Sequence, residues 1–236
     1  MSALELVNYD DRGTVLTGWL ARPTGAARGA IVIYPTIANI TPAMERRAGL
    51  LADAGFIAMI ADFYGEPIAS FEASRPLGDK LRADVDHYRT RCSAAITTLA
   101  GHPLAKGLRM AAIGYCMGGQ AALEMARIGQ ALALAASFHG ILATNRPATA
   151  ETPISARLLI CHGDADPMVP REQVMAFWHE MDAAQANWHF HSYAGVKHGF
   201  TDPGSEDRGM AALAYDASAD RQSWAALMAL LDEVFA

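Results

Sequence analysis

The sequence predicts an α/β fold, a doubly wound and mostly parallel sheet with helices on both of its faces. Two observations support this prediction. Short apolar runs rich in Val, Ile, Leu and Ala alternate with longer helix-like stretches, and this alternation is typical of β-α-β units. The central runs are apolar almost throughout, as expected for parallel strands that helices cover on both sides.

The expected strands and helices follow one another in this alternating order. Strands are expected over residues 15–21, 30–34, 57–62, 109–115, 133–138, 157–162 and 188–193. Helices are expected near residues 42–54, 78–100, 117–129, 171–184 and 208–235. For the first helix, Thr41 is the expected N-cap, Pro42 suits the first turn and Gly55 marks the end. Right-handed crossovers between the strands place helices on both faces of the sheet.

Residues 63–78 are the irregular part of the chain. They contain prolines and glycines and follow no clear period. The segment begins after an expected strand, where α/β sheets place their ligands. It is interpreted either as an ordinary surface loop or as a lid or pocket wall.

Length and composition limit the class of protein. A chain of 236 residues, 52% of them hydrophobic, suits a single α/β domain over residues 1–236. The net charge of -6 provides no basic patch, so nucleic acid is not an expected partner. No apolar run approaches the ~20 residues that span a bilayer, and no signal peptide is evident. Three cysteines argue against a disulfide framework. We therefore expect a cytoplasmic monomer or homodimer that acts on a small molecule and does not bind a membrane.

A reactive cysteine is the most informative feature of the sequence. Gly114, Tyr115, Cys116, Met117 and Gly118 follow an apolar run and precede an expected helix. This is the setting of a nucleophile elbow, in which glycines flank the reactive residue because the backbone packs closely there. The residue at the tip is a cysteine, whose reactive form is the thiolate. A buried structural thiol is the alternative interpretation.

A nucleophile of this kind needs a general base and a group that orients the base. Asp166 lies in a loop after the strand expected over residues 157–162, and His198 lies in a loop after the last expected strand. Nucleophile, acid and histidine in this order along the chain match a known type of catalytic triad. His198 is expected to take the thiol proton and Asp166 to orient the imidazole. Asp164 competes for the role of the acid.

Two backbone N–H groups are expected to stabilise the oxyanion of a tetrahedral intermediate. One belongs to Met117, the residue after the nucleophile. The other is expected at Ile37, in the loop after the strand over residues 30–34. The imidazole of His198 and the N-terminus of the helix that follows Cys116 should both favour the thiolate.

Five motifs carry a resemblance to a known family. They are Gly-Tyr-Cys-Met-Gly-Gly at 114–119, His-Gly-Asp-Ala-Asp-Pro-Met-Val-Pro at 162–170, Lys-His-Gly-Phe at 197–200, Ala-Asp-Phe-Tyr-Gly at 61–65 and Ser-Phe-His-Gly at 137–140. As an ordered set they resemble the dienelactone hydrolase family of the α/β-hydrolase superfamily, over nearly the whole chain. The resemblance implies the triad Cys116, Asp166 and His198, with the amides of Ile37 and Met117 as oxyanion hole. It also implies hydrolysis of lactones or esters through a thioester, without a metal or an organic cofactor.

Two positions depart from the pattern of that family. Well-known members carry a glutamate after the third strand that interacts with the resting cysteine, and the matching residue is Thr36. They also hold the substrate's carboxylate with arginines, one of them four residues after the catalytic histidine, where this chain has Asp202. Because Asp202 would repel an anionic lactone, we expect neutral, apolar substrates. Arg75 or Arg82 is a candidate replacement, and solvated surface charge is the simpler interpretation of both.

Five residues are expected in the substrate pocket, namely Thr36, Tyr64, Tyr115, His139 and Phe200. For the three aromatic ones, core packing is the alternative, and for His139 the alternative is a bond to the backbone.

Other residues with reactive side chains are given structural interpretations. His162 is expected to orient the acid loop, and Cys92 and Cys161 to be buried and inert. His189 and His191 alternate along a strand, but no third ligand at a suitable spacing accompanies them, so no metal site is expected.

The predicted function is hydrolysis of activated carboxylic esters and lactones by a cysteine nucleophile. A thiolate leaves more readily than most alkoxides, so enol lactones and aryl esters should be good substrates and amides poor ones. Hydrolysis of a neutral aryl phosphotriester is a side activity that the same geometry would allow. The alternatives are an acyltransferase with the same triad, a redox thiol enzyme and a non-catalytic ligand-binding protein.

Overall fold

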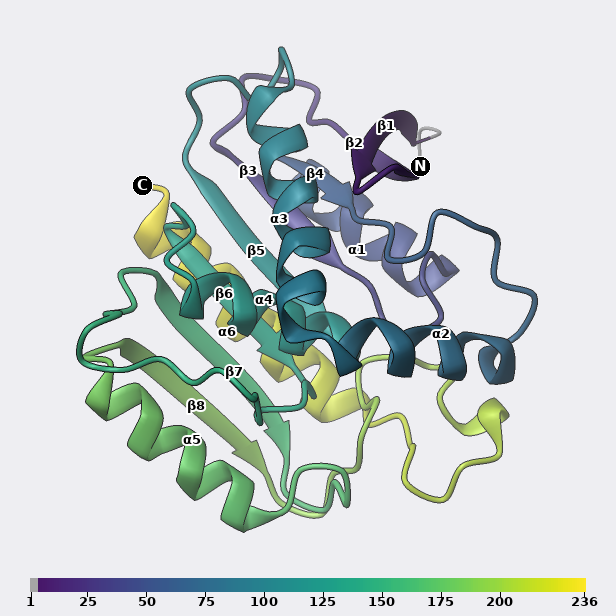
Figure 1. The fold of residues 1–236 in the computed structure, drawn as a ribbon, viewed down its shortest axis with the longest axis vertical. Helices are drawn as coiled ribbons and strands as arrows, with labels where there is room; N and C mark the ends of the chain where they lie inside the picture. Colours follow the sequence, from purple (N-terminus) through teal and green to yellow (C-terminus); the bar gives the residue numbers. More distant parts are fainter. Residues whose placement is uncertain (1–3) are drawn as a thin grey trace.

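A computed structural model describes residues 4–236 of the chain. Its centre is an eight-stranded sheet in the order β1-β2-β4-β3-β5-β6-β7-β8 (Figure 1). β2 pairs antiparallel with both β1 and β4, and all other neighbouring strands are parallel. The strands are β1 Glu5–Asp11, β2 Thr14–Ala21, β3 Gly29–Tyr34, β4 Phe56–Ile60, β5 Met110–Tyr115, β6 Leu134–Phe138, β7 Arg157–Gly163 and β8 Asn187–Tyr193.

Helices cover both faces of this sheet. Side chains of α3, α4 and α5 pack in an apolar cluster on one face, and those of α1 and α6 pack in a second cluster on the other. The helices are α1 Pro42–Asp53, α2 Phe71–Ala83, α3 Val85–Gly101, α4 Met117–Arg127, α5 Arg171–Ala183 and α6 Ala217–Val234, with a short 3-10 helix η1 Glu206–Arg208. The predicted fold class, a doubly wound α/β sheet, is confirmed. No helix within residues 4–236 is long and apolar enough to cross a membrane.

α1 begins and ends as its sequence predicts. The hydroxyl of Thr41 accepts the N–H of Met44 at 3.4 Å, and Pro42 occupies the first turn. Gly55, two residues beyond the end of the helix, adopts a φ of 92°, which a side chain would disfavour.

Apolar periodicity does not predict β1, and the structure adds this strand to the sheet. β1 pairs with β2 from Glu5 opposite Leu20 to Asp11 opposite Thr14. The two residues between the strands, Arg12 and Gly13, have φ values of 53° and 79°, as a tight hairpin turn requires. Much of β1 is polar and exposed, so it lacks the apolar run by which the other strands are recognised.

Two predicted helices have the wrong bounds. The stretch 78–100 contains the end of α2 and most of α3, and Asp84 separates them. Asp84 is extended, and its carboxylate accepts the N–H groups of Asp86 and His87 at 3.0 Å, so it caps a new helix. The stretch 208–235 is helical in α6 only from Ala217 onward.

α2 begins inside the segment that the sequence leaves irregular. The hydroxyl of Ser70 accepts the N–H of Ala73 at 3.2 Å and caps the helix before Phe71. Pro76 has no N–H to donate, yet the helix continues through it to Ala83. The helix lies beside the carboxyl ends of the parallel strands (Figure 1).

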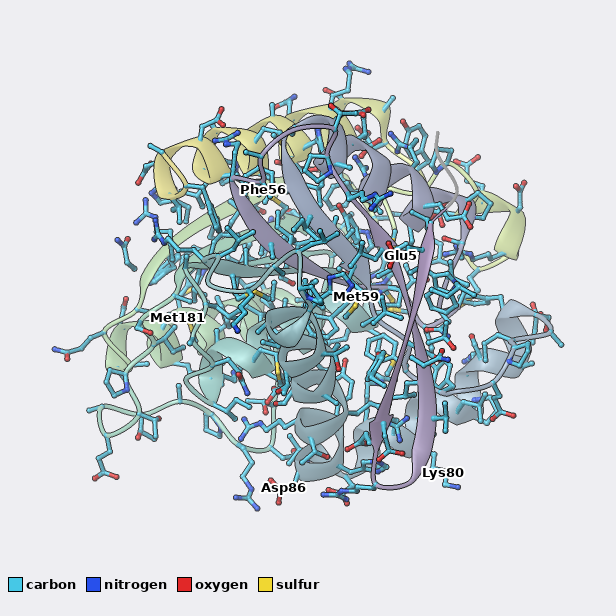
Figure 2. All side chains as sticks on the ribbon, turned by 90° about the horizontal axis from the view of Figure 1, so that it is seen from above. Glu5, Phe56, Met59, Lys80, Asp86 and Met181 are labelled. Carbon is cyan, nitrogen blue, oxygen red and sulfur yellow. The ribbon has the colours of Figure 1, made fainter. Side chains whose placement is uncertain are left out.

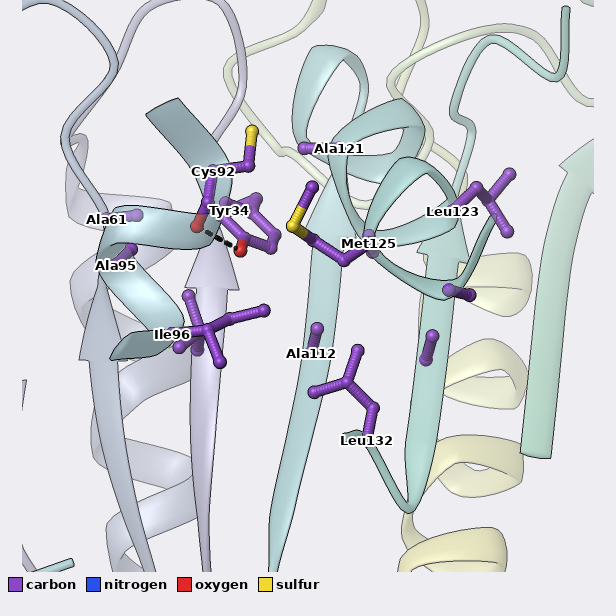
Figure 3. Packing of buried hydrophobic residues seen from close by; sticks show 14 of the residues in the cluster. Tyr34, Ala61, Cys92, Ala95, Ile96, Ala112, Ala121, Leu123, Met125 and Leu132 are labelled. Carbon is purple, nitrogen blue, oxygen red and sulfur yellow. Dashed lines mark hydrogen bonds between the residues drawn. The ribbon is translucent and has the colours of Figure 1, made fainter. Parts of the chain in front are cut away.

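The core consists of the two apolar clusters on either face of the sheet. Figure 3 shows part of the first, with Met125 of α4, Ile96 of α3 and Ala112 of β5 among its members. In the view from above, Phe56 and Met59 lie inside the molecule, whereas Lys80 and Asp86 project at its periphery (Figure 2). A sheet covered on both faces leaves its carboxyl edge as the open place for a site.

Candidate active site

Cys116 lies on a strained turn between β5 and α4. Its φ of 56° and ψ of -118° lie in a region that residues other than glycine rarely adopt. A Cβ added to Gly114 would lie 1.8 Å from the carbonyl oxygen of Gly118, and one added to Gly118 would lie 2.0 Å from that of Tyr34. Both flanking glycines are therefore required by close packing of the backbone, as in a nucleophile elbow.

His139 holds the backbone of this turn. The N–H of Cys116 donates to the carbonyl oxygen of Phe138 at 3.0 Å and to Nδ1 of His139 at 3.1 Å. Because Nδ1 accepts, the proton of the ring is on Nε2, which lies 2.9 Å from the hydroxyl of Thr201. Burial and the charge of His198 keep the pKa of His139 well below its ordinary value. His139 is therefore neutral and also lines the cavity described below.

Asp166 and His198 lie together beyond β7 and β8. Nδ1 of His198 is 2.7 Å from Oδ2 of Asp166, and both side chains are buried. The other oxygen of Asp166 accepts the N–H of Met168 at 2.8 Å. Asp164 instead pairs with the exposed Arg171 at 2.6 Å. The contact that orients the imidazole therefore belongs to Asp166.

Cys116 and His198 stabilise each other's charged form. Burial raises the pKa of Cys116, but the charge of His198 and the N–H groups of Met117 and Ile37 bring it below its ordinary value. Burial lowers the pKa of His198, but Cys116 and Asp166 raise it to about 10. Nε2 of His198 is buried and has no hydrogen-bond partner within residues 4–236. The attraction between the imidazolium of His198 and the sulfur of Cys116 is therefore mainly one of charge. Both shifts favour the thiolate of Cys116 beside the imidazolium of His198.

The pH dependence of Cys116 alkylation by iodoacetamide should reflect the charge pair between Cys116 and His198. Only the thiolate reacts, and a free thiol has a pKa of ~8.5, so the rate should reach half of its maximum at a lower pH. His198→Ala removes the largest influence that lowers the pKa, so its midpoint should lie at higher pH. Mass spectrometry would assign the label to Cys116, and identical midpoints in the two proteins would contradict the charge pair.

The backbone N–H groups of Ile37 and Met117 both interact with the Cys116 sulfur and lower its pKa. Met117 is the first residue of α4, where an N–H has no partner inside the helix. Ile37 lies in a tight loop after β3, closed by a bridge between Thr36 and Asn39. Two donors that converge on one point are what an oxyanion hole requires.

A cavity of about 150 Å³ opens beside Cys116 and His198. Its apolar lining consists of Ile37, Phe71, Met117, Ile141, Met168, Met210 and Leu213. Its polar lining consists of Thr36, Arg75, Asp79, Arg82, His139, Asp202 and Arg208. Four of these residues come from α2. Two of them, Phe71 and Arg75, lie in the segment 63–78 that the sequence leaves as a loop or a wall, and this part of the segment is a wall of the cavity.

The carboxylates in the cavity wall are paired with arginines. Arg82 binds Asp79 at 2.7 Å, and Arg208 pairs with Asp202. The guanidinium of Arg208 also lies over the ring of Phe71, 5.0 Å from its centre. The prediction that Asp202 repels an anionic substrate is therefore wrong, because Arg208 neutralises its carboxylate.

Three residues expected in the pocket wall do not line the cavity, and that expectation is corrected for Tyr64, Tyr115 and Phe200. Tyr115 is fully buried on the other face of the sheet, stacked on Phe138 at 4.7 Å, because successive residues of β5 point to opposite faces. Phe200 is fully buried and packs edge-on against His139. Tyr64 lies behind the cavity, where its hydroxyl donates to the carbonyl oxygen of Ile37 at 3.0 Å.

The sequence interpretation missed much of the cavity wall. Ile141 directly follows the motif at 137–140, and Met168 lies within the motif at 162–170. Their positions in the sequence could therefore have predicted that they line the pocket. Arg208, Met210 and Leu213 come from an irregular segment, where no periodicity or motif points to a pocket.

The other reactive side chains are buried away from the cavity. Burial raises the pKa of Cys92 well above its ordinary value and that of Cys161 to about 12. The expectation that both are inert agrees with their burial. His162 is buried beside Phe190, and burial lowers its pKa. Within residues 4–236, no group of three His, Cys, Asp or Glu side chains could hold a metal ion.

The sheet, the elbow and the cavity at the carboxyl edge define the protein as an enzyme of the α/β-hydrolase fold. The chain belongs to the dienelactone hydrolase family, whose model matches residues 16–235, and it is a hydrolase of esters or lactones.

Comparison with other proteins agrees with this assignment. An uncharacterised protein of Caenorhabditis elegans is 34% identical over 63% of this chain and 94% of its own length. A probable 2-oxo-3-(5-oxofuran-2-ylidene)propanoate lactonase of a Bradyrhizobium species is 29% identical over 84% of each chain. The solved structure of a dienelactone hydrolase-like promiscuous phosphotriesterase from metagenomic libraries is 33% identical over 100% of both chains, with a TM-score of 0.89.

Proposed function

We propose that the protein hydrolyses activated carboxylic esters and lactones with Cys116 as the nucleophile, through a thioester. One observation carries the proposal. The sulfur of Cys116 interacts with the imidazole of His198, which Asp166 holds at 2.7 Å, and with the N–H groups of Ile37 and Met117. Nucleophile, base and oxyanion donors thus converge at one point of the cavity.

In the first step, the thiolate of Cys116 attacks the carbonyl carbon of the substrate. A C–S bond forms, and the electron pair of the carbonyl moves to its oxygen, which the N–H groups of Ile37 and Met117 stabilise. The oxyanion then collapses and the C–O bond breaks. His198 gives its proton to the departing oxygen, and an acyl group remains on Cys116 as a thioester.

In the second step, water attacks the thioester while the neutral His198 takes one of its protons. The second tetrahedral oxyanion occupies the same two N–H groups. When the C–S bond breaks, the acid is released, and the thiolate of Cys116 and the imidazolium of His198 are restored. Asp166 stabilises the imidazolium and keeps Nε2 directed toward the reacting atoms.

The thiolate also limits the range of substrates. In the first tetrahedral adduct, the sulfur competes with the departing oxygen, and a poor oxygen leaving group returns the adduct to substrate. Enol lactones and aryl esters should therefore react well. Neutral aryl phosphotriesters offer the same kind of leaving group, and the similar metagenomic enzyme is described as a promiscuous phosphotriesterase.

Neutral and apolar substrates fit the cavity best. Seven apolar side chains line it, and the carboxylates of Asp79 and Asp202 pair with Arg82 and Arg208. Arg75 is the third arginine of the wall, and it has no ion pair within residues 4–236. The position of the family's resting-state glutamate holds the uncharged Thr36. Control of the resting thiolate is therefore assigned to His198 and the two backbone N–H groups.

A substrate panel tests the proposed function. It contains p-nitrophenyl butyrate, ethyl butyrate, a neutral enol lactone, the same lactone with a carboxylate, and a diethyl aryl phosphate. We expect the aryl ester and the neutral lactone to have the highest kcat/KM, and the carboxylate to lower it about tenfold, because the mostly apolar lining would desolvate its charge. A preference for the anionic lactone would overturn the substrate assignment. Failure to hydrolyse any ester or lactone would overturn the proposed function, and transfer of the acyl group to an added alcohol would indicate an acyltransferase.

A further inference from the structure

Two tyrosine hydroxyls bind the two residues that supply the proposed oxyanion donors. The hydroxyl of Tyr64, in the loop after β4, donates to the carbonyl oxygen of Ile37 at 3.0 Å. The hydroxyl of Tyr88, on α3, donates to the carbonyl oxygen of Met117 at 2.7 Å. Neither ring lines the cavity, so neither contact is one with substrate.

Packing holds both rings in place. Tyr88 is 1% exposed, and the ring of Phe63 lies 6.0 Å from the rings of both Tyr64 and Tyr88. Gly78 of α2 makes room for this arrangement, since a Cβ there would lie 2.6 Å from Ile37 Cδ1 and 3.1 Å from the Tyr64 hydroxyl. The hydroxyl of Tyr64 is also 3.7 Å from the sulfur of Met117. This aromatic group thus connects the loop of Ile37 with the start of α4.

The direction of these bonds does not change with pH. Burial raises the pKa of both Tyr64 and Tyr88. Both phenols therefore keep their protons and remain donors at neutral pH and well above it. A carbonyl oxygen can only accept, so the hydroxyls anchor the chain at Ile37 and Met117 on the carbonyl side of each residue. The N–H groups of the same residues are left for the sulfur of Cys116, whose pKa they lower.

We propose that Tyr64 and Tyr88 are positioning residues of the oxyanion hole, which fix the spacing of the Ile37 and Met117 amides through their carbonyl groups. The inference rests on the proposed function, because it assigns a role to residues behind the proposed catalytic amides. Donors aimed at a developing charge stabilise it only when they are held in place before the reaction. Small displacements of such groups cost up to about 100-fold in rate.

Removal of either hydroxyl should lower kcat and leave substrate binding nearly unchanged. In Tyr64→Phe and Tyr88→Phe, kcat for p-nitrophenyl butyrate should fall about tenfold, with KM changed less than about twofold. The pH midpoint of Cys116 alkylation should also rise, since the same N–H groups lower the pKa of the thiol. A purely structural role would reduce thermal stability and leave this midpoint where it is.

Tyr34→Phe is a matched control. Tyr34 is fully buried, and its hydroxyl donates to a backbone carbonyl oxygen of α3, that of Cys92, at 2.7 Å (Figure 3). This variant loses the same kind of bond without touching Ile37 or Met117, so kcat and the alkylation midpoint should equal those of the native chain. Melting temperatures of all three variants measure the cost to stability alone.

The outcomes separate this inference from the proposed function. An inactive native protein, or a fully active Cys116→Ala variant, would refute the proposed function. An active native protein whose Tyr64→Phe and Tyr88→Phe variants match Tyr34→Phe in kcat and in alkylation midpoint would refute only the positioning role. A lower kcat and a higher midpoint in both variants, with folding retained, would support it.

Discussion

Cys116→Ala should abolish the hydrolysis of p-nitrophenyl butyrate and leave the fold intact. The variant removes the nucleophile. The N–H groups of Ile37 and Met117 and the imidazole of His198 can then assist only a direct attack by water, so kcat should fall by on the order of 10⁴ or more. Alanine is smaller than cysteine and keeps a Cβ, so the packing of the elbow is preserved. Activity measured by release of p-nitrophenolate and folding measured by circular dichroism would test this expectation. Native activity in the variant would refute the mechanism.

Cys116→Ser tests why the nucleophile is a cysteine. An alkoxide leaves less readily than a thiolate, so the adduct formed by serine should expel alkoxides more effectively. The ratio of ethyl butyrate to p-nitrophenyl butyrate turnover should therefore rise in the variant, although its total activity falls. If this ratio is unchanged or lower in the variant, the argument that the thiolate restricts the substrate range is wrong.

After the loss of Cys116, the substitutions His198→Ala and Asp166→Asn should lower kcat the most. Loss of the imidazole removes the group that protonates the departing oxygen and activates water, so kcat should fall by on the order of 10³ or more. Asp166→Asn keeps the shape of the side chain, but it no longer fixes the tautomer or stabilises the imidazolium, and kcat should fall by a comparable factor.

Asp164→Asn is the matched control for Asp166→Asn. Both aspartates lie in the loop after β7, but Asp164 pairs with the exposed Arg171 at 2.6 Å, while Asp166 lies 2.7 Å from His198. Asp164→Asn should keep kcat within about twofold, because exposed ion pairs contribute little. Equal losses in the two variants would show that the loop as a whole, and not the carboxylate of Asp166, supports the activity.

The parallel strands were predictable because burial on both faces leaves little but Val, Ile, Leu and Ala in them. β1 was not, because its exposed polar residues lie on an edge strand that one hairpin holds in place. The helix bounds near Asp84 depended on a side-chain cap, and a cap of this kind does not interrupt the apolar pattern. α2 was hidden by Pro76, which the helix tolerates.

The residues of the candidate site also fall into those that the sequence could predict and those that it could not. The positions of Cys116, Asp166 and His198 at one edge of the sheet were predictable, because each lies in the turn or loop after a parallel strand and the carboxyl ends of such strands meet at one edge. Tyr115 was assigned to the wrong face, although it is next to the nucleophile, because the pleat turns successive side chains to opposite sides. Tyr64 was predicted to line the pocket, but its hydroxyl binds the carbonyl oxygen of Ile37 and its ring does not line the cavity.

The sequence by itself determined the fold class, the elbow around Cys116 and the order of the acid and the histidine. Each of these is written in short local patterns, the apolar runs and the motifs at 114–119, 162–170 and 197–200, and in the order in which they follow one another. Only the tertiary structure decided which segments form the cavity wall. α2, the loop after β6 and residues 202–213 meet there, and Arg208 neutralises Asp202. These contacts join parts of the chain that are brought together by packing of the whole sheet and its helices, and no local spacing encodes them.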